Sequence, residues 1–192
     1  MQPSAKHWLE NKAQAFFRRV GLKEGQVVLD FGCNKGSYAI PASQVVGRHG
    51  KVYALDKERD ALSGLQRKLK KQGQGSVECL EVAEHEGIPL PARSVDAVLL
   101  YDVLHRGYFP DLRERKRLLA DVHRVLKPGG LLSFHATHLR EYGMTFAKAV
   151  DEVRSVGFDL RGRSYRRLVH DDRLVRGQVF SFTKGTQARL CG

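Results

Sequence analysis

Short apolar runs alternate with longer amphipathic stretches along the chain, and this alternation predicts the fold. Apolar runs bounded by glycine or polar turns are typical of buried strands. They lie at residues 26–31, 51–56, 77–82, 95–101 and 131–136. Stretches with apolar positions at helical spacing lie at residues 8–20, 37–46, 59–72, 112–126 and 146–156. Strands separated by helices predict a Rossmann-like α/β fold, with a mostly parallel sheet and helices on both faces.

The last third of the chain has a looser pattern. Residues 158–169 and 179–182 alternate between apolar and polar positions, which fits a C-terminal antiparallel strand pair that closes the sheet. Before it, Lys127-Pro128-Gly129-Gly130 is a strong helix breaker. A length of 192 residues suits one domain. We expect a single domain over residues 1–192, with an N-terminal helix in 1–21, a core in 22–137, and a helix and closing strands in 138–192.

Composition narrows the class of protein. Apolar residues make up 42% of the chain, which is enough for a hydrophobic core. No stretch approaches the roughly 20 apolar residues of a membrane-spanning helix, and the first residues have no apolar signal-peptide core. Cys33, Cys79 and Cys191 have no metal-binding spacing, so we expect free thiols. These features predict a cytoplasmic protein, and none of them indicates an oligomeric state.

The net charge of +12 and the pI of about 9.9 raise the expectation of an anionic partner. RNA, a nucleotide-like ligand and an acidic lipid surface all fit. A solvated basic surface is an equal alternative, because net charge bears on association and solubility rather than on fold. Basic residues gather in two clusters, which are Arg113, Arg115, Lys116 and Arg117, and Arg161, Arg163, Arg166 and Arg167.

The most informative segment joins the first predicted strand to the next helix, and it reads Asp30-Phe31-Gly32-Cys33-Asn34-Lys35-Gly36. Its glycines permit a tight turn with positive φ angles. The free N–H groups of the following helix face the crevice where parallel strands end. Asp30 would repel a phosphate but suits a cationic ligand. Asp56 ends the second strand, where a carboxylate can bind both hydroxyls of a ribose; taken alone, such an aspartate is more often a helix cap.

Together these residues resemble class I S-adenosylmethionine-dependent methyltransferases. The turn is similar to their first motif, D-x-G-x-G-x-G, with Asn34 at the middle glycine, and asparagine tolerates left-handed backbone. Residues 88–98 resemble the "LPFPDNSFDVV" segment of the type-11 subgroup, which includes quinone-biosynthesis enzymes. Arg124-Val125-Leu126-Lys127-Pro128-Gly129-Gly130 matches the subgroup's "RVLKPGG" signature. The resemblance covers residues 22–137.

The resemblance implies methyl transfer from S-adenosylmethionine, with S-adenosylhomocysteine as product and residues 22–137 as the cofactor-binding core. The segment Ala83-Glu84 stands where the family usually contacts the adenine, and Asp102 stands beside the methionine part of the cofactor and the substrate. The residues expected to bind the cofactor are Asp30, Gly32, Cys33, Asn34, Gly36, Asp56, Lys57, Ala83, Glu84 and Asp102.

Three histidines are candidate general bases. The sulfonium already activates the methyl group, so the protein must mainly align the acceptor, and a base is needed only for a protonated acceptor. His105 ends the fourth predicted strand, and His135 and His138 lie at the end of the fifth. Ordinary structural imidazoles are the alternative. The spacing of His135 and His138 can ligate a metal, but no third ligand is evident, so we expect no metal site.

The acceptor is the most open question at this stage. The subgroup resemblance favours a small molecule, whereas the basic clusters leave an RNA methyltransferase open. The sequence after the fourth strand has no N/D-P-P-Y/F motif, which argues against methylation of an adenine or glutamine amino group. A nicotinamide-dependent oxidoreductase would need G-x-G-x-x-G, but Ser37 replaces its last glycine. A non-catalytic module that binds S-adenosylmethionine or RNA is the remaining alternative.

Overall fold

A seven-stranded mixed sheet forms the centre of the computed structural model, which describes residues 1–83 and 86–185. The strands are β1 (Val27–Phe31), β2 (Lys51–Asp56), β3 (Val77–Glu81), β4 (Val95–Tyr101), β5 (Leu126–His135), β6 (Phe158–His170) and β7 (Arg173–Lys184). Their order is β3-β2-β1-β4-β5-β7-β6. The first five strands pair in parallel, and β7 pairs antiparallel with both β5 and β6. The predicted Rossmann-like sheet with a C-terminal antiparallel pair is confirmed.

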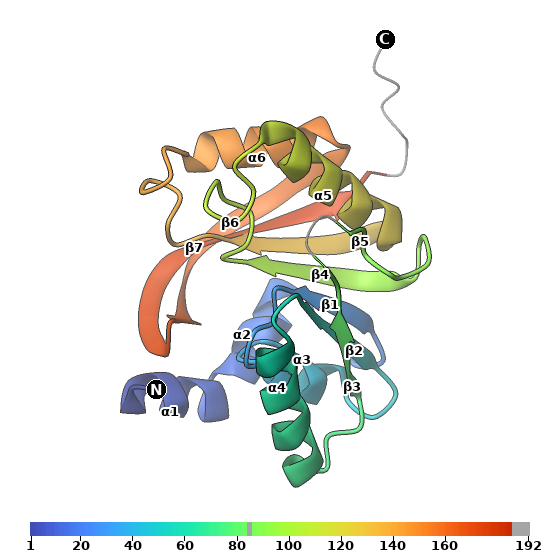
Figure 1. Cartoon of the computed structure of the whole chain (residues 1–192), viewed down its shortest axis with the longest axis vertical. Helices are drawn as coiled ribbons and strands as arrows, with labels where there is room; N and C mark the ends of the chain where they lie inside the picture. The colour runs from blue at the N-terminus through green and yellow to red at the C-terminus, as the bar shows by residue number, and fades with distance from the viewer. Residues whose placement is uncertain (84–85, 186–192) are drawn as a thin grey trace.

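Helices cover both faces of the sheet, as predicted (Figure 1). One face carries α1 (Pro3–Asn11), α2 (Ala13–Val20), α3 (Ala39–Val46) and α4 (Arg59–Gln72), and the other carries α5 (Leu112–Val125) and α6 (Phe146–Ser155). Alternate residues of each strand enter opposite cores. In β1, Val28 packs with the α1–α4 cluster, whereas Leu29 packs with the α5–α6 cluster. The central strands β1 and β4 are apolar except for one aspartate each, because both of their faces are covered.

The structure differs from the prediction in the N-terminal segment and at the start of β5. The N-terminal segment forms two helices rather than one, because the backbone leaves the helical conformation at Lys12, where φ is −122° and ψ is −22°. The helix breaker ends α5 as predicted, but it also opens β5, which starts at Leu126 rather than at residue 131. A register shift between Val95 and Ala97 accommodates this irregular start.

The β6–β7 hairpin is longer than predicted and reaches the carboxyl end of the parallel strands. Asp171 and Asp172 connect its strands, with φ angles of 46° and 61°. Two successive positive φ angles are typical of the two-residue turns that join antiparallel strands. The carbonyl oxygen of Asp172 accepts a hydrogen bond of 2.9 Å from the amide of Gln2. The turn is therefore anchored to the start of α1.

Arg115 departs from the expectation of a solvated basic cluster, because its side chain is only 6% exposed. Its guanidinium donates two hydrogen bonds to the Glu152 carboxylate, at 2.9 and 3.0 Å. It also donates to the carbonyl oxygens of Phe109 and Pro110, at 2.7 and 3.1 Å. Arg115 thus joins α5 to α6 and fixes the loop that follows β4.

Two smaller expectations concern membrane helices and thiols. Within residues 1–83 and 86–185, no helix has the length and apolar content required to cross a membrane. Cys33 and Cys79 are free thiols, as predicted, and Cys191 lies outside the described residues.

Candidate active site

A cavity of about 1270 Å³ opens at the carboxyl ends of the parallel strands. Its walls come from the turn after β1, the end of β2, the loop after β4, helix α5 and the β6–β7 turn. The connections leave β1 and β4, which are neighbours, in opposite directions across the sheet. This is the switch point at which open α/β sheets bind ligands. Five segments of the chain therefore meet at the expected crevice.

The turn after β1 keeps its shape despite the asparagine in place of a glycine. Asn34 adopts the left-handed conformation with a φ of 47°, as its side chain permits. Gly32 and Gly36 have φ angles of 76° and 78°. A Cβ atom at Gly32 would lie 2.5 Å from Val103, and one at Gly36 would lie 2.3 Å from Leu65. Both positions therefore require glycine, for conformation and for space.

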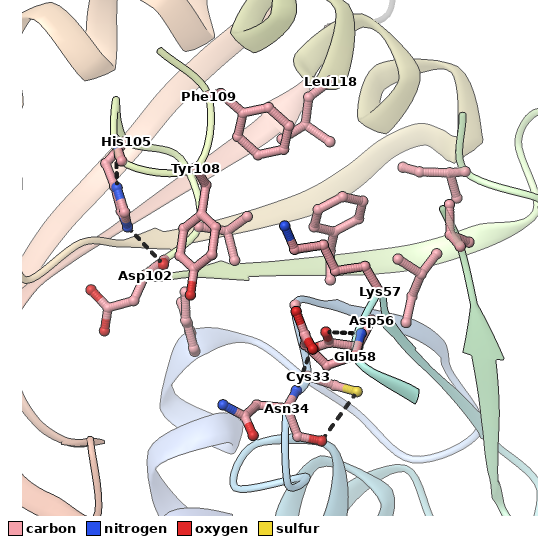
Figure 2. A pocket seen from close by; sticks show the side chains of 18 of the residues that line it. Cys33, Asn34, Asp56, Lys57, Glu58, Asp102, His105, Tyr108, Phe109 and Leu118 are labelled. Atoms are coloured by element: carbon pink, nitrogen blue, oxygen red, sulfur yellow. Dashed lines mark hydrogen bonds between the residues drawn. The ribbon is translucent and has the colours of Figure 1, made fainter. Parts of the chain in front are cut away.

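The Asp56 carboxylate fastens this turn to the end of β2 (Figure 2). Its Oδ2 accepts a hydrogen bond of 2.6 Å from the Asn34 amide, and its Oδ1 accepts one of 3.0 Å from the Glu58 amide. Asp56 is not the N-cap of α4, because Glu58 occupies that position. A carboxylate accepts about four hydrogen bonds. Asp56 lines the cavity and retains acceptor capacity for a ligand.

Asp30 is buried directly behind the turn. It is 2% exposed, and within the described residues its Oδ2 has no hydrogen-bond partner. Burial, reinforced by the charge of Asp56, raises the pKa of Asp30 to about 7, although a backbone hydrogen bond from Ala39 opposes the shift. A buried carboxylate with an unused oxygen is unfavourable, and such groups concentrate at functional sites.

Asp102 connects the ends of three strands at the opposite wall. It follows β4 with a φ of 55°, and its carboxylate accepts hydrogen bonds from the Thr137 amide, from the Thr137 hydroxyl at 3.0 Å and from His170 Nδ1 at 2.9 Å. Burial raises the pKa of Asp102, but the hydrogen bond from His170 and the proximity of His135 more than offset it, so the pKa lies below its usual value. Asp102 is therefore ionised at neutral pH.

His105 lies on the cavity wall with both ring nitrogens engaged. Nε2 donates to the Asp102 carbonyl oxygen at 3.2 Å, and Nδ1 accepts from the Gly107 amide at 3.1 Å (Figure 2). Its ring stacks on Tyr142, with centroids 4.7 Å apart and planes 2° apart. Burial lowers the pKa of His105, so the imidazole is neutral. Proton uptake at Nδ1 would break the hydrogen bond from the Gly107 amide. The geometry therefore suits His105 to line the cavity rather than to act as a general base.

The other two candidate histidines have different environments. His135 is 1% exposed and does not line the cavity, and its Nδ1 bonds the Gln178 carbonyl oxygen at 2.7 Å. His138 does line the cavity, where its Nε2 lies 2.6 Å from Nε2 of His170. His105 and His138 thus line the cavity, whereas His135 is buried away from it.

Most of the residues predicted to bind a cofactor gather at this cavity. Asp30 and Gly36 lie behind its wall, and Glu84 lies outside the described residues. Those that line it are Gly32, Cys33, Asn34, Asp56, Lys57, Ala83 and Asp102. Burial raises the pKa of the Cys33 thiol, which therefore stays protonated.

The sequence reasoning missed several residues that line the cavity. Tyr142 follows β5, and His170 and Asp171 lie at the hairpin turn. Their positions depend on strand pairing between distant segments. The His170-Asp171-Asp172 run between two alternating stretches was the available signal for a turn, but it did not indicate proximity to the cavity. Phe109 and Leu118, which were also missed, lie with Tyr108 across the cavity from Asn34 and Asp56 (Figure 2).

Comparison with known proteins assigns the family. Residues 28–130, which include the glycine turn, Asp56 and Asp102, match the family described as "Methyltransferase domain". The chain belongs to this methyltransferase domain family. Membership implies S-adenosylmethionine as the cosubstrate, as the sequence resemblance did.

Two relatives of known name are similar to part of the chain. The chain is 32% identical over 114 residues to the chloroplastic 2-phytyl-1,4-beta-naphthoquinone methyltransferase of Arabidopsis thaliana, covering 59% of this chain and 42% of that protein. It is 30% identical over 140 residues to the ubiquinone/menaquinone biosynthesis C-methyltransferase UbiE of Escherichia fergusonii, covering 72% of this chain and 50% of that protein. The chain thus spans about half the length of the curated relatives it matches.

Solved structures share the fold over nearly the whole chain. A SAM-dependent methyltransferase from Aquifex aeolicus superposes with a TM-score of 0.76 at 24% identity, covering 95% of this chain and 94% of that one. A SAM-dependent methyltransferase from Methanosarcina mazei gives a TM-score of 0.73 at 17% identity, covering 90% and 98%. At these identities the similarity establishes the fold.

Proposed function

We propose that the chain transfers the methyl group of S-adenosylmethionine to a small-molecule acceptor and releases S-adenosylhomocysteine. The observation that carries this proposal is that the glycine turn after β1, with Asp56 beside it, opens into a cavity of about 1270 Å³. Single small-molecule sites commonly measure roughly 300–1,000 Å³. The cavity therefore has room for a cofactor and an acceptor together.

Residues at the ends of β1, β2, β3 and β4 would bind the cofactor. Asp56 would bind the ribose hydroxyls with its remaining acceptor capacity. The turn containing Gly32 and Asn34 would approach the cofactor closely, and Asp30 behind it would favour the cationic end. Ala83 would contact the adenine, and Asp102 would lie near the methionine part. Methyl transfer then requires alignment of the acceptor more than acid–base chemistry.

The opposite wall favours a flat, ring-bearing acceptor. Tyr108, Phe109, Tyr142 and the neutral ring of His105 line it, and offset or edge contacts with such rings stabilise aromatic ligands. The relatives named as naphthoquinone and demethylmenaquinone methyltransferases are named for acceptors of this shape. We therefore propose that the acceptor is a small cyclic molecule.

Methyl transfer from tritium-labelled S-adenosylmethionine into cell extract tests this proposal. After incubation the extract is separated into RNA, protein and small molecules. Label in the small-molecule fraction that disappears with heat-inactivated protein is the expected result. Label confined to RNA or protein would overturn the acceptor class, and no label in any fraction would favour a non-catalytic binding module.

Replacing Asp56 tests the proposed ribose contact. Hydrogen bonds to a charged group contribute roughly 1.5–3 kcal/mol, and about 1.4 kcal/mol is a factor of ten in affinity. Asp56→Ala should therefore weaken S-adenosylmethionine binding by about ten- to a hundredfold in calorimetry. Asp60→Ala, at an exposed aspartate of α4, is the control and should bind normally. Unchanged affinity in Asp56→Ala would mean that Asp56 only stabilises the turn and does not contact the cofactor.

An RNA acceptor is the second candidate, because the edge strand β6 carries an exposed basic strip. Arg161, Arg163 and Arg167 are exposed on it, and Tyr165 between them is 59% exposed. Basic residues interspersed with an aromatic ring suit single-stranded nucleic acid. None of these residues lines the cavity.

A salt series decides whether this strip binds RNA. Each phosphate contact releases counterions, so the logarithm of an RNA affinity falls steeply with the logarithm of the salt concentration. Charge reversal at Arg161, Arg163, Arg166 and Arg167 should flatten that slope in filter binding if RNA is the acceptor, while cofactor affinity stays constant. With a small-molecule acceptor, we expect weak RNA binding that these substitutions hardly change. Tight, salt-sensitive binding that is lost in the variant would overturn the small-molecule proposal.

A further inference from the structure

Three potential metal ligands converge at the edge of the cavity. Nε2 of His138 lies 2.6 Å from Nε2 of His170, which in turn lies 3.2 Å from Oδ2 of Asp171. The three ligand atoms all lie within 4.8 Å of one another, and all three residues line the cavity. His138 follows β5, whereas His170 and Asp171 come from the hairpin turn. Pairing of β7 with both β5 and β6, rather than spacing in the sequence, builds this cluster.

Carboxylates fix the orientation of both imidazoles. Nδ1 of His138 lies 2.8 Å from Glu141 Oε2, and Nδ1 of His170 lies 2.9 Å from Asp102 Oδ2. An ionised carboxylate only accepts hydrogen bonds, so both Nδ1 atoms must donate. When both imidazoles are neutral, each has a single N–H and each Nε2 presents a lone pair, although the hydrogen bond to Asp102 raises the pKa of His170. The two lone pairs and the Asp171 carboxylate oxygen then face one another, and this arrangement is favourable only around a positive charge.

We infer that His138, His170 and Asp171 form a binding site for a divalent transition-metal ion of the zinc type. Histidines that bind metals typically donate their other ring N–H to a carboxylate, as both do here. Imidazole nitrogen and carboxylate oxygen lie roughly 2.0–2.2 Å from zinc, which places neighbouring ligands of a tetrahedral ion about 3.2–3.5 Å apart. The contact between His170 and Asp171 already has this length, and the two Nε2 atoms must separate by under about 1 Å.

A metal ion at this site would bind the methyl acceptor. Three protein ligands leave a position for water or substrate, as in catalytic zinc sites. A metal ion favours the deprotonated form of a hydroxyl or thiol bound to it, with the proton released to solvent. This role rests on the proposed function, whereas the metal site rests on its own geometry. The expectation of no metal site considered only His135 and His138, whereas the two ligands that join His138 come from a turn more than thirty residues away.

Metal titration of the full, untagged chain tests the inference. After chelator treatment and dialysis, calorimetry with Zn²⁺ near neutral pH should show one ion per chain, and Co²⁺ should give the absorption spectrum of a tetrahedral site. His138→Gln and Asp171→Asn should abolish this binding, and Glu141→Gln should weaken it by about 10–100-fold. Asparagine tolerates the positive φ of position 171, so Asp171→Asn preserves the turn. His49→Ala, at an exposed histidine between α3 and β2, is the matched control and should bind normally.

Parallel titration with S-adenosylmethionine separates this inference from the proposed function. Folded protein that binds S-adenosylmethionine but not Zn²⁺ or Co²⁺ would overturn the metal site and indicate that a proton occupies the cluster. Binding that is unchanged in both His138→Gln and Asp171→Asn would also overturn it. Zn²⁺ binding that these variants abolish, without any S-adenosylmethionine binding, would support the metal site while contradicting the proposed function.

Discussion

Asp30→Asn should make the ligand-free protein more stable at neutral pH and remove a pH dependence of its stability. Burial and Asp56 raise the pKa of Asp30 from 3.8 to about 7 in the folded state. Between these values the unfolded chain is ionised at Asp30 and the folded chain is protonated, so stability falls as pH rises from about 4 to about 7 and is constant above that. Each pKa unit corresponds to 1.36 kcal/mol, which gives a total of up to about 4 kcal/mol.

Urea unfolding of the wild type and of Asp30→Asn across this pH range measures the effect. The free energies of unfolding should diverge as pH rises, with the variant becoming the more stable protein. Asp60→Asn, at an exposed aspartate of α4, removes the same charge and should follow the wild type. Saturating S-adenosylmethionine should reduce the divergence, because a cationic group near Asp30 favours its ionised form. A difference that stays constant from pH 4 to pH 8 would contradict this account of Asp30.

Arg115→Ala should lower the free energy of unfolding by about 3–5 kcal/mol, because it leaves the Glu152 carboxylate buried without its partner. The Glu152 side chain is 14% exposed and receives both of its hydrogen bonds from Arg115 at 3.0 Å or less. The substitution also removes the donor to the carbonyl oxygens of Phe109 and Pro110. The loop that carries Tyr108 to the cavity wall should therefore loosen.

Urea unfolding with a matched control tests the Arg115 prediction. Arg113→Ala removes the same charge two residues earlier, where the side chain is 92% exposed, and should cost less than about 1 kcal/mol. The double variant Arg115→Ala, Glu152→Ala should be less destabilised than the sum of its single variants, because no charge is left unpaired. Equal losses in Arg113→Ala and Arg115→Ala would mean that burial of the ion pair has no energetic consequence.

Local patterns predicted the parallel half of the fold well. Strands β2 and β4 and helix α4 have the predicted bounds, because each combines a clear hydrophobic period with a turn or glycine at its ends. The start of β5 could not be predicted in this way. Proline and glycines at 128–130 indicate a break, and only pairing of Leu126 with Val95 draws this segment into the sheet.

In the candidate site, too, residues placed by short-range sequence were predictable and residues placed by long-range contacts were not. Asp56 and Asn34 were predictable, because they lie within one strand–turn–helix unit whose geometry follows from short-range sequence. The buried state of Arg115 was not, since it depends on Glu152 from another helix. The cluster of His138, His170 and Asp171 requires the antiparallel hairpin to be in place before its members meet. Contacts between segments distant in sequence therefore determine the parts of the site that local sequence patterns could not predict.

Calorimetry of the full chain with S-adenosylmethionine and S-adenosylhomocysteine tests the central claim most directly, namely that the cavity at the ends of β1, β2 and β4 is a cofactor site. The account predicts one site per chain for each ligand, accompanied by an increase in the thermal unfolding temperature, since a ligand that binds only the folded state stabilises it. No heat and no thermal shift with either ligand, in protein shown to be folded, would contradict the account.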